Sequence, residues 1–204
     1  MKIMHFAGGG DIGGAKTHIL SLGKELAENN QFRLISFRKG PFSEEAKAKG
    51  LDVVEVENAW NLFSCLHVAL KAVDEFKPDI IHCHGAKANM MGVMVKKLRH
   101  IPICTTVHSD PTRDYMGSPV KQLVFGSING WALNRMDYYM AVAGEMERSL
   151  ISMGMDPQRI FIIHNGLDFS HAEDKYRDKS DDEEIVIGIA ARLTPIKNIP
   201  LLLR

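Results

Sequence analysis

Residues 3–18 read Ile3-Met4-His5-Phe6-Ala7-Gly8-Gly9-Gly10-Asp11-Ile12-Gly13-Gly14-Ala15-Lys16-Thr17-His18. A short apolar strand, a glycine-rich turn and the first turns of a helix follow one another in this stretch. The helix is indicated by apolar side chains at helical spacing, which are Ala15, Ile19, Leu22 and Leu26. Residues 3–18 therefore predict a strand–turn–helix unit, the repeating element of α/β domains.

The same alternation of short strands and helix-length amphipathic stretches continues almost to the end of the chain. Further strands are predicted at residues 32–37, 51–56, 79–84, 103–108, 138–143 and 160–164. Several, such as Ile160-Phe161-Ile162-Ile163, are continuous apolar runs, which are typical of strands covered on both faces. Residues 119–136 predict a core helix, because their apolar face is wide and their polar face lacks a basic cluster. The predicted fold class is α/β, with a Rossmann-like doubly wound, mostly parallel sheet.

The composition changes near the end of the chain and predicts a domain boundary there. Charged residues dominate between His171 and Glu184, where no aliphatic residue is larger than alanine, as in a linker or an exposed loop. Strand character restarts at Ile185. We therefore expect an N-terminal Rossmann-like domain over residues 1–168, a linker over 169–184 and the truncated start of a second domain over 185–204.

Composition also excludes several classes of protein. Lys plus Arg number 25 and Asp plus Glu number 25, so no basic field would attract nucleic acid. Cys65, Cys83 and Cys104 show no pairing pattern and are expected to be free thiols, two of them within apolar runs. The N-terminus is too soon interrupted by glycine for a secretory signal, and no apolar run approaches the roughly 20 residues of a membrane span. These features predict a soluble cytoplasmic protein.

Polar residues that could form a site collect at the ends of the predicted strands, where parallel sheets bind ligands. The glycine-rich turn suits an anion, because glycines allow close backbone approach and a helix start attracts negative charge. It matches neither the dinucleotide fingerprint nor a P-loop, so a flexible turn is the alternative interpretation. Arg192 and Lys197 could hold a phosphate as a bidentate ligand and a point charge, or be ordinary surface charges.

Three histidines at strand ends allow more than one interpretation. His82 and His84 are two residues apart and share one face of their strand, with Cys83 on the other. They could form a zinc pair with His108 or Asp110 as third ligand, although no HExxH helix accompanies them. We favour a satisfied core histidine at His82 and a cleft-exposed one at His84. His108 could bond a sugar, act as an acid or base, or cap the following loop.

Five motifs, in this order, resemble glycosyltransferase family 4, whose members have the GT-B fold. They are Gly13-Gly14-Ala15-Lys16-Thr17-His18, Asp79-Ile80-Ile81-His82-Cys83-His84, Thr106-Val107-His108, Asn165-Gly166-Leu167-Asp168 and residues 188–198. The last is similar to the family's GRLxPxKN element, with Ala191 where glycine usually stands, and Leu167 replaces the usual valine. The resemblance implies that this chain is one half of a GT-B fold, in which an acceptor-binding domain faces a domain that binds a nucleotide sugar.

The resemblance also implies roles for individual residues. Gly13 and Gly14 would contact the donor diphosphate, which Arg192 and Lys197 would neutralise. His108, the catalytic candidate, would lie against the donor sugar. The nucleotide sugar is a substrate, so the resemblance implies neither a cofactor nor a metal. The acceptor-side candidates are Lys16, His84, Arg113 and Tyr115.

The implied reaction is retaining, metal-independent transfer of a hexosyl group from a nucleotide sugar to a glycan or lipid-linked acceptor. It would belong to polysaccharide biosynthesis and take place in the cytoplasm, with peripheral contact at the inner face of the membrane. Lys16 stands where many relatives carry glutamate, and the family's paired-glutamate motif is absent from the chain. We therefore expect the 204-residue chain to lack turnover. The alternatives are a nucleotide-sugar epimerase or hydrolase, a non-catalytic carbohydrate-binding domain and a zinc hydrolase.

Overall fold

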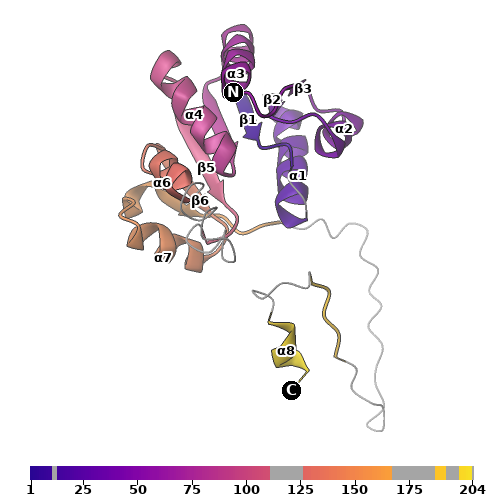
Figure 1. The fold of residues 1–204 in the computed structure, drawn as a ribbon, viewed down its shortest axis with the longest axis vertical. Helices are drawn as coiled ribbons and strands as arrows, with labels where there is room; N and C mark the ends of the chain where they lie inside the picture. Colours follow the sequence, from indigo (N-terminus) through magenta and orange to yellow (C-terminus); the bar gives the residue numbers. More distant parts are fainter. Residues whose placement is uncertain (11–12, 111–125, 167–186, 192–197, 204) are drawn as a thin grey trace. The chain divides into compact units, whose positions relative to one another are not determined.

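The computed structural model describes residues 1–10, 13–110, 126–166, 187–191 and 198–203 (Figure 1). Contacts divide the chain into two units, Met1–Gly166 and Leu167–Arg204. Several predicted features lie outside the described residues: Arg113, Tyr115, Arg192, Lys197 and the linker at 169–184.

The first unit is built on a sheet of seven parallel strands, so the predicted doubly wound α/β fold is confirmed. The strands stand in the order β3-β2-β1-β4-β5-β6-β7. Their bounds are β1 Lys2–Ala7, β2 Gln31–Ser36, β3 Val53–Glu55, β4 Ile80–His84, β5 Ile103–Val107, β6 Tyr138–Ala141 and β7 Ile160–Ile162.

Helices cover the sheet from both sides, so the central strands are buried on both faces. On one side, α1 (Gly14–Asn29) and α2 (Pro41–Ala48) pack with Phe32 and Leu34 of β2 in a small apolar cluster. The other helices contribute to a larger cluster on the opposite face. They are α3 (Leu62–Phe76), α4 (Ala86–Arg99), α6 (Ser127–Leu133) and α7 (Gly144–Ser152), and a 3₁₀ turn at Pro157–Arg159 precedes β7.

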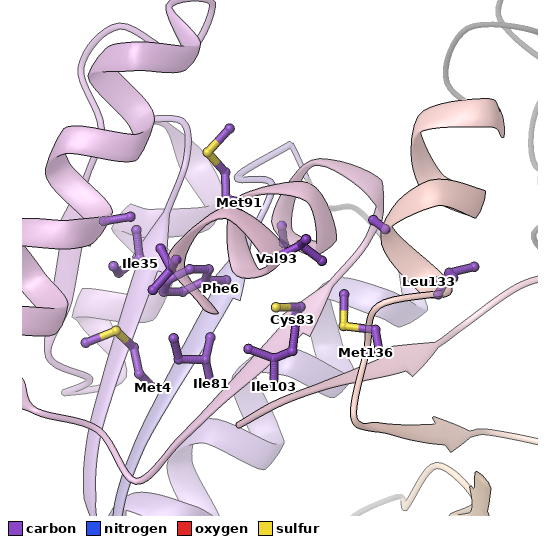
Figure 2. Close-up of a cluster of buried hydrophobic side chains, with 14 of the residues drawn as sticks. Met4, Phe6, Ile35, Ile81, Cys83, Met91, Val93, Ile103, Leu133 and Met136 are labelled. Carbon is purple, nitrogen blue, oxygen red and sulfur yellow. The ribbon is translucent and has the colours of Figure 1, made fainter. Parts of the chain in front are cut away.

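The larger cluster is the main core of the unit (Figure 2). Met4 and Phe6 of β1 lie in it beside Ile81 and Cys83 of β4, and all four side chains are fully buried. Because side chains alternate along a strand, the residues between them, including His5 and His82, face α1 instead. The core therefore fixes which side of the sheet the histidines occupy.

The structure corrects the prediction for the apolar run at residues 160–163 and describes only part of the helix predicted at 119–136. The run at Ile160–Ile163 is not covered on both faces, since Phe161 and Ile163 are each 49% exposed. β7 is an edge strand, which pairs with β6 alone, and the face that carries these two side chains is left half-exposed. The helix predicted at 119–136 is described from residue 126 onward and there forms α6, with Ala132 and Leu133 in the core as expected.

The structure bears on the predictions for the cysteines and for membrane-spanning helices. Cys65, Cys83 and Cys104 are free and buried, as predicted. No helix among the described residues is long and apolar enough to cross a membrane.

The described part of the second unit does not form the predicted strand. Residues 187–191 are not assigned to a strand, and Ile187 is 73% exposed. A strand needs a neighbour to pair its backbone, and the described residues of this unit supply none. A short helix, α8 (Ile199–Leu202), follows.

Candidate functional site

The carboxyl ends of β1 and β4 form the switch point of the sheet. The chain leaves β1 toward β2 on one side, and leaves β4 toward β5 on the other. Ligands of doubly wound sheets bind in the crevice outside such a point. Ala7 and His84, the last residues of the two strands, are direct neighbours in the register. The candidate site therefore lies around these two residues.

The glycine-rich turn after β1 offers open backbone at this point. Gly9 has a φ of 81°, and a Cβ there would lie 2.6 Å from the carbonyl oxygen of Arg38, so the turn requires glycine. Gly13 is the N-cap of α1, with a φ of 64° and no side-chain cap bond among the described residues. A Cβ on Gly13 or Gly14 would meet no described atom within 4 Å. The exposed amides at this helix start are suited to an anion.

Arg38 adds a cation beside this turn that the sequence analysis missed. It is exposed and follows β2, the other neighbour of β1. Its Nη1 lies 3.7 Å from the position that a Cβ on Gly10 would take. The sequence does show an arginine directly after the predicted strand. It does not show that this strand lies beside β1, which is what brings Arg38 to the glycine-rich turn.

Five histidines gather at the α1 side of the switch point. This histidine cluster consists of His5 on β1, His18 on α1, His82 and His84 on β4, and His108 just after β5. Neighbouring ring centroids lie 4.3–6.2 Å apart. Two nitrogen–nitrogen contacts link three of the rings: Nε2 of His84 lies 3.2 Å from Nδ1 of His5, and Nδ1 of His84 lies 3.4 Å from Nε2 of His108. His84 therefore connects the buried end of the cluster to its outer end.

Some of these histidines lie where the sequence predicted them. His82 and His84 do share a face, with stacked rings 4.3 Å apart, and Cys83 lies in the core on the other face. His82 is buried and satisfied as predicted, because its Nε2 lies 2.7 Å from Oγ1 of Thr106. The prediction of a cleft-exposed His84 is wrong. This side chain is 1% exposed, since rings from β1, α1 and the end of β5 surround it.

His5 is the member of the cluster that the sequence analysis missed. Its Cα is the direct register partner of His82, so the two imidazoles lie side by side on adjacent strands. The signal was the alternation of β1, which places His5 on the face opposite to Met4 and Phe6. Reading that signal requires knowing that β1 pairs with β4.

Burial keeps the cluster neutral. Desolvation, followed by the charges of neighbouring histidines, lowers the pKa of His82 to about 3 and that of His108 to about 4. The same causes hold the pKa values of His5 and His84 well below the usual range. At neutral pH these imidazoles are uncharged, so His108 offers a single N–H and a single lone pair. It is half-buried and lies at the carboxyl end of the sheet, where a ligand can reach it.

The Asn165-Gly166 motif reaches the cluster from the far end of the first unit. The side chain of Asn165 hydrogen-bonds to His18, which partly offsets the lowering of the His18 pKa by burial. His18 in turn lies edge-on to His108, with ring centroids 4.9 Å apart. Two of the motifs quoted from the sequence therefore meet at one place in the fold.

Lys16 is engaged within the domain. Its Nζ lies 2.6 Å from Oε2 of Glu45 on α2, and both side chains are only partly exposed. This ion pair ties the start of α1 to α2. The lysine is therefore not free to offer its whole charge to a ligand.

This fold and site define an α/β, Rossmann-like domain of the GT-B type. The sequence matches Glycosyltransferase Family 4 over residues 12–171, and the chain belongs to that family. A search of curated proteins returned no match to the chain.

Solved structures with the same fold include transferases and an epimerase. The Anabaena protein Alr3699/HepE in complex with UDP is similar, with a TM-score of 0.69 and 17% identity, over 83% of this chain and 45% of that one. The lipopolysaccharide outer core galactosyltransferase WaaB is similar with a TM-score of 0.65 and 15% identity, over 83% of this chain and 47% of that one. The UDP-N-acetylglucosamine 2-epimerase of Rickettsia bellii is similar with a TM-score of 0.63 and 15% identity, over 81% of this chain and 45% of that one. At these identities the likeness concerns the fold. The chain spans about half the length of these proteins.

Proposed function

We propose that the chain is the acceptor-side part of a retaining, metal-independent glycosyltransferase. The enzyme would move a hexosyl group from a nucleotide sugar to a glycan or lipid-linked acceptor, in polysaccharide biosynthesis at the cytoplasmic face of the membrane. The observation that carries the proposal is the family match over residues 12–171. Two similar folds add support, because one was solved with UDP-glucose and another is named a galactosyltransferase.

In this proposal the glycine turn and the histidine cluster serve the donor. The open amides at Gly13 and Gly14 would bond the diphosphate, with Arg38 as a further cation beside the turn. Arg192 and Lys197 would neutralise the leaving group in place of a divalent metal. His108 would hydrogen-bond the donor sugar as a neutral imidazole, since its pKa is lowered to about 4.

The acceptor would be recognised by other residues. We propose Arg113 and Tyr115 for direct contact. His84 acts through His108 and does not touch substrate, because it is buried and its Nδ1 contacts His108. Lys16 contributes to the shape of the acceptor side through its ion pair with Glu45.

The test is a transfer assay with a form of the protein that extends through both halves of the GT-B fold. Purified protein would be given a panel of nucleotide sugars and glycan or polyprenyl-phosphate acceptors. We expect product with the anomeric configuration of the donor and no requirement for added Mg²⁺ or Mn²⁺. His108→Ala should lower kcat by about 10²–10⁴, the usual contribution of a general acid–base or sugar-contacting side chain. His67→Ala, an exposed histidine on α3, should leave kcat unchanged.

Two outcomes would contradict the proposal. Epimerised free nucleotide sugar without any acceptor would favour the second candidate, an epimerase, for which the similarity to the Rickettsia bellii enzyme speaks. Glycan binding without nucleotide-dependent chemistry would favour a binding domain. The 204-residue chain by itself should give no turnover, because the family's paired glutamates are absent from it.

A further inference from the structure

The buried end of the histidine cluster holds three imidazoles on two adjacent strands. His82 and His84 come from the same face of β4, and His5 comes from β1 directly opposite His82. One nitrogen from each ring can be chosen so that all three lie within 4.8 Å of one another. All three side chains are buried, with exposures of 0% for His5, 4% for His82 and 1% for His84. Three side chains that bind metals through nitrogen therefore converge at one point.

The spacing of two of these nitrogens is that of ligands on one ion. Zinc–imidazole bonds are about 2.0–2.1 Å long, which puts two nitrogens of a tetrahedral site about 3.3–3.4 Å apart. Nε2 of His84 and Nδ1 of His5 are 3.2 Å apart. The ligand nitrogens of all three rings lie within 4.8 Å of one another, so the third ring would have to move closer to reach the same spacing.

The chemistry of the site selects the kind of ion. The groups that face the trio from α1 and β5 are His18, His108, Thr106 and Cys104, and the described cluster contains no carboxylate. Neutral imidazoles suit Zn²⁺, Co²⁺, Ni²⁺ or Cu²⁺, whereas Mg²⁺ and Ca²⁺ prefer oxygen.

Neighbouring groups are placed to support metal-bound rings. When Nε2 of His84 binds an ion, its remaining proton lies on Nδ1 and points to Nε2 of His108, 3.4 Å away. Oγ1 of Thr106, 2.7 Å from Nε2 of His82, holds that ring in the same way. Only one of the two rings carries the proton of the His84–His5 contact, and that ring would move its proton to its opposite nitrogen, where the other ring already carries its own, so both stay neutral. His108 would then accept at Nε2 and carry its own proton on Nδ1. Nε2 of His5 has no hydrogen-bond partner among the described residues and is available to carry a proton.

A cavity lies beside one member of the trio, His82. It has a volume of about 240 Å³, lies between α1 and the sheet and is lined by His18, His82, Thr106 and Met140, among others.

We propose that His5, His82 and His84 form a binding site for a single borderline transition-metal ion, of which Zn²⁺ is the representative. The site is separate from the donor chemistry, which stays metal-independent. It also revises the zinc arrangement considered from the sequence, because the third ligand is His5 on β1 and not His108 or Asp110. An ion there would fix His84 in the tautomer that donates to His108.

The experiment uses the untagged 204-residue chain, stripped with a chelator and then incubated with Zn²⁺ or Co²⁺. After removal of free metal, we expect close to one ion per chain by mass spectrometry and the intense visible absorption of tetrahedral Co²⁺. His5→Gln and His82→Gln should each lower the affinity at least about tenfold, since each removes one of three ligands. His67→Gln and His100→Gln, both exposed, should bind as the unaltered chain does.

If a variant does not fold, measurements on the unaltered chain still test the site. Ring-nitrogen NMR spectra should then show metal-induced shifts at His5, His82 and His84. Absence of bound metal in the unaltered chain would overturn the proposal. Metal binding lost only in His18→Gln or His108→Gln would place the ion at the outer end of the cluster and overturn it as well. Near-ultraviolet thiolate absorption in the Co²⁺ form would do the same, since it would assign a ligand role to Cys104, the register partner of His82.

Discussion

Among single residues, the buried histidines make the stability of the domain depend on pH. A histidine whose pKa is lowered by folding binds its proton more readily in the unfolded chain. The folded state is therefore favoured above the unfolded pKa of 6.5 and loses that advantage as the pH falls toward the folded value, about 3 for His82 and about 4 for His108. The loss amounts to about 1.4 kcal/mol per pH unit for each such histidine.

We accordingly predict that the urea midpoint of the chelator-treated chain falls steadily between pH 7 and pH 5. His82→Gln should make this fall less steep, because it removes one titrating group. His67→Gln should leave the slope as it is, because His67 is exposed on α3. Equal urea midpoints at pH 7 and pH 5 would contradict the prediction, because they would show that protonation of the cluster does not destabilise the folded state.

The sequence was sufficient to predict part of this cluster. Alternation along a strand put His82 and His84 on one face without any knowledge of the fold. The burial of His84 could not be predicted, because it depends on His5, His18 and His108, which approach from other elements. Local pattern gives the direction of a side chain, whereas its exposure depends on what the tertiary structure packs against it.

Among the elements, the contact between α4 and β4 is closest at Gly92. A Cβ at this position would lie 2.5 Å from Sγ of Cys83. Gly92→Ala should therefore destabilise the domain by about 1–3 kcal/mol, as overpacking does, although alanine is the better helix former. The free energy of unfolding from urea titrations measures the effect.

Two further variants separate the contact from helix propensity. Gly130→Ala on α6 should stabilise the domain by about 0.5–1 kcal/mol, because its Cβ would meet no described atom within 4 Å. Adding Cys83→Ala to Gly92→Ala should recover part of the loss, since it removes the sulfur that the new methyl group meets. Equal changes in the free energy of unfolding for Gly92→Ala and Gly130→Ala would contradict the prediction. They would show that α4 and β4 move apart enough to accept the added methyl group.

The elements also show where sequence patterns are ambiguous. The strand at Ile160 was predicted from its run of apolar residues, which is typical of a covered strand. In the fold it is the edge strand β7, and Phe161 and Ile162 of this strand and Ile163 just after it are 43–49% exposed. An apolar run predicts burial, but the burial of a strand depends on what packs against its faces. Position within a sheet depends on pairing between segments far apart in sequence.

For the molecule as a whole, the core belongs to the first unit. Every buried residue among those described lies between Met4 and Ile160. In the second unit, Ile187 and Leu203 are 73% and 80% exposed. We predict that a chain ending at Gly166 melts within about 2 °C of the 204-residue chain, a shift that corresponds to less than about 1 kcal/mol at this size. Calorimetry measures it, and a Tm lower by about 5 °C or more would contradict the prediction.

The central position of β1 has a consequence for synthesis of the protein. The ribosome makes β1 first among the strands, yet β1 pairs with β2 on one side and with β4, residues 80–84, on the other. Until residue 84 has left the exit tunnel, the nascent chain carries β1 with one unpaired apolar edge. Such edges favour misassociation and slow folding. Chaperone binding to ribosome-bound chains should therefore be strongest before β4 emerges and weaken once it does.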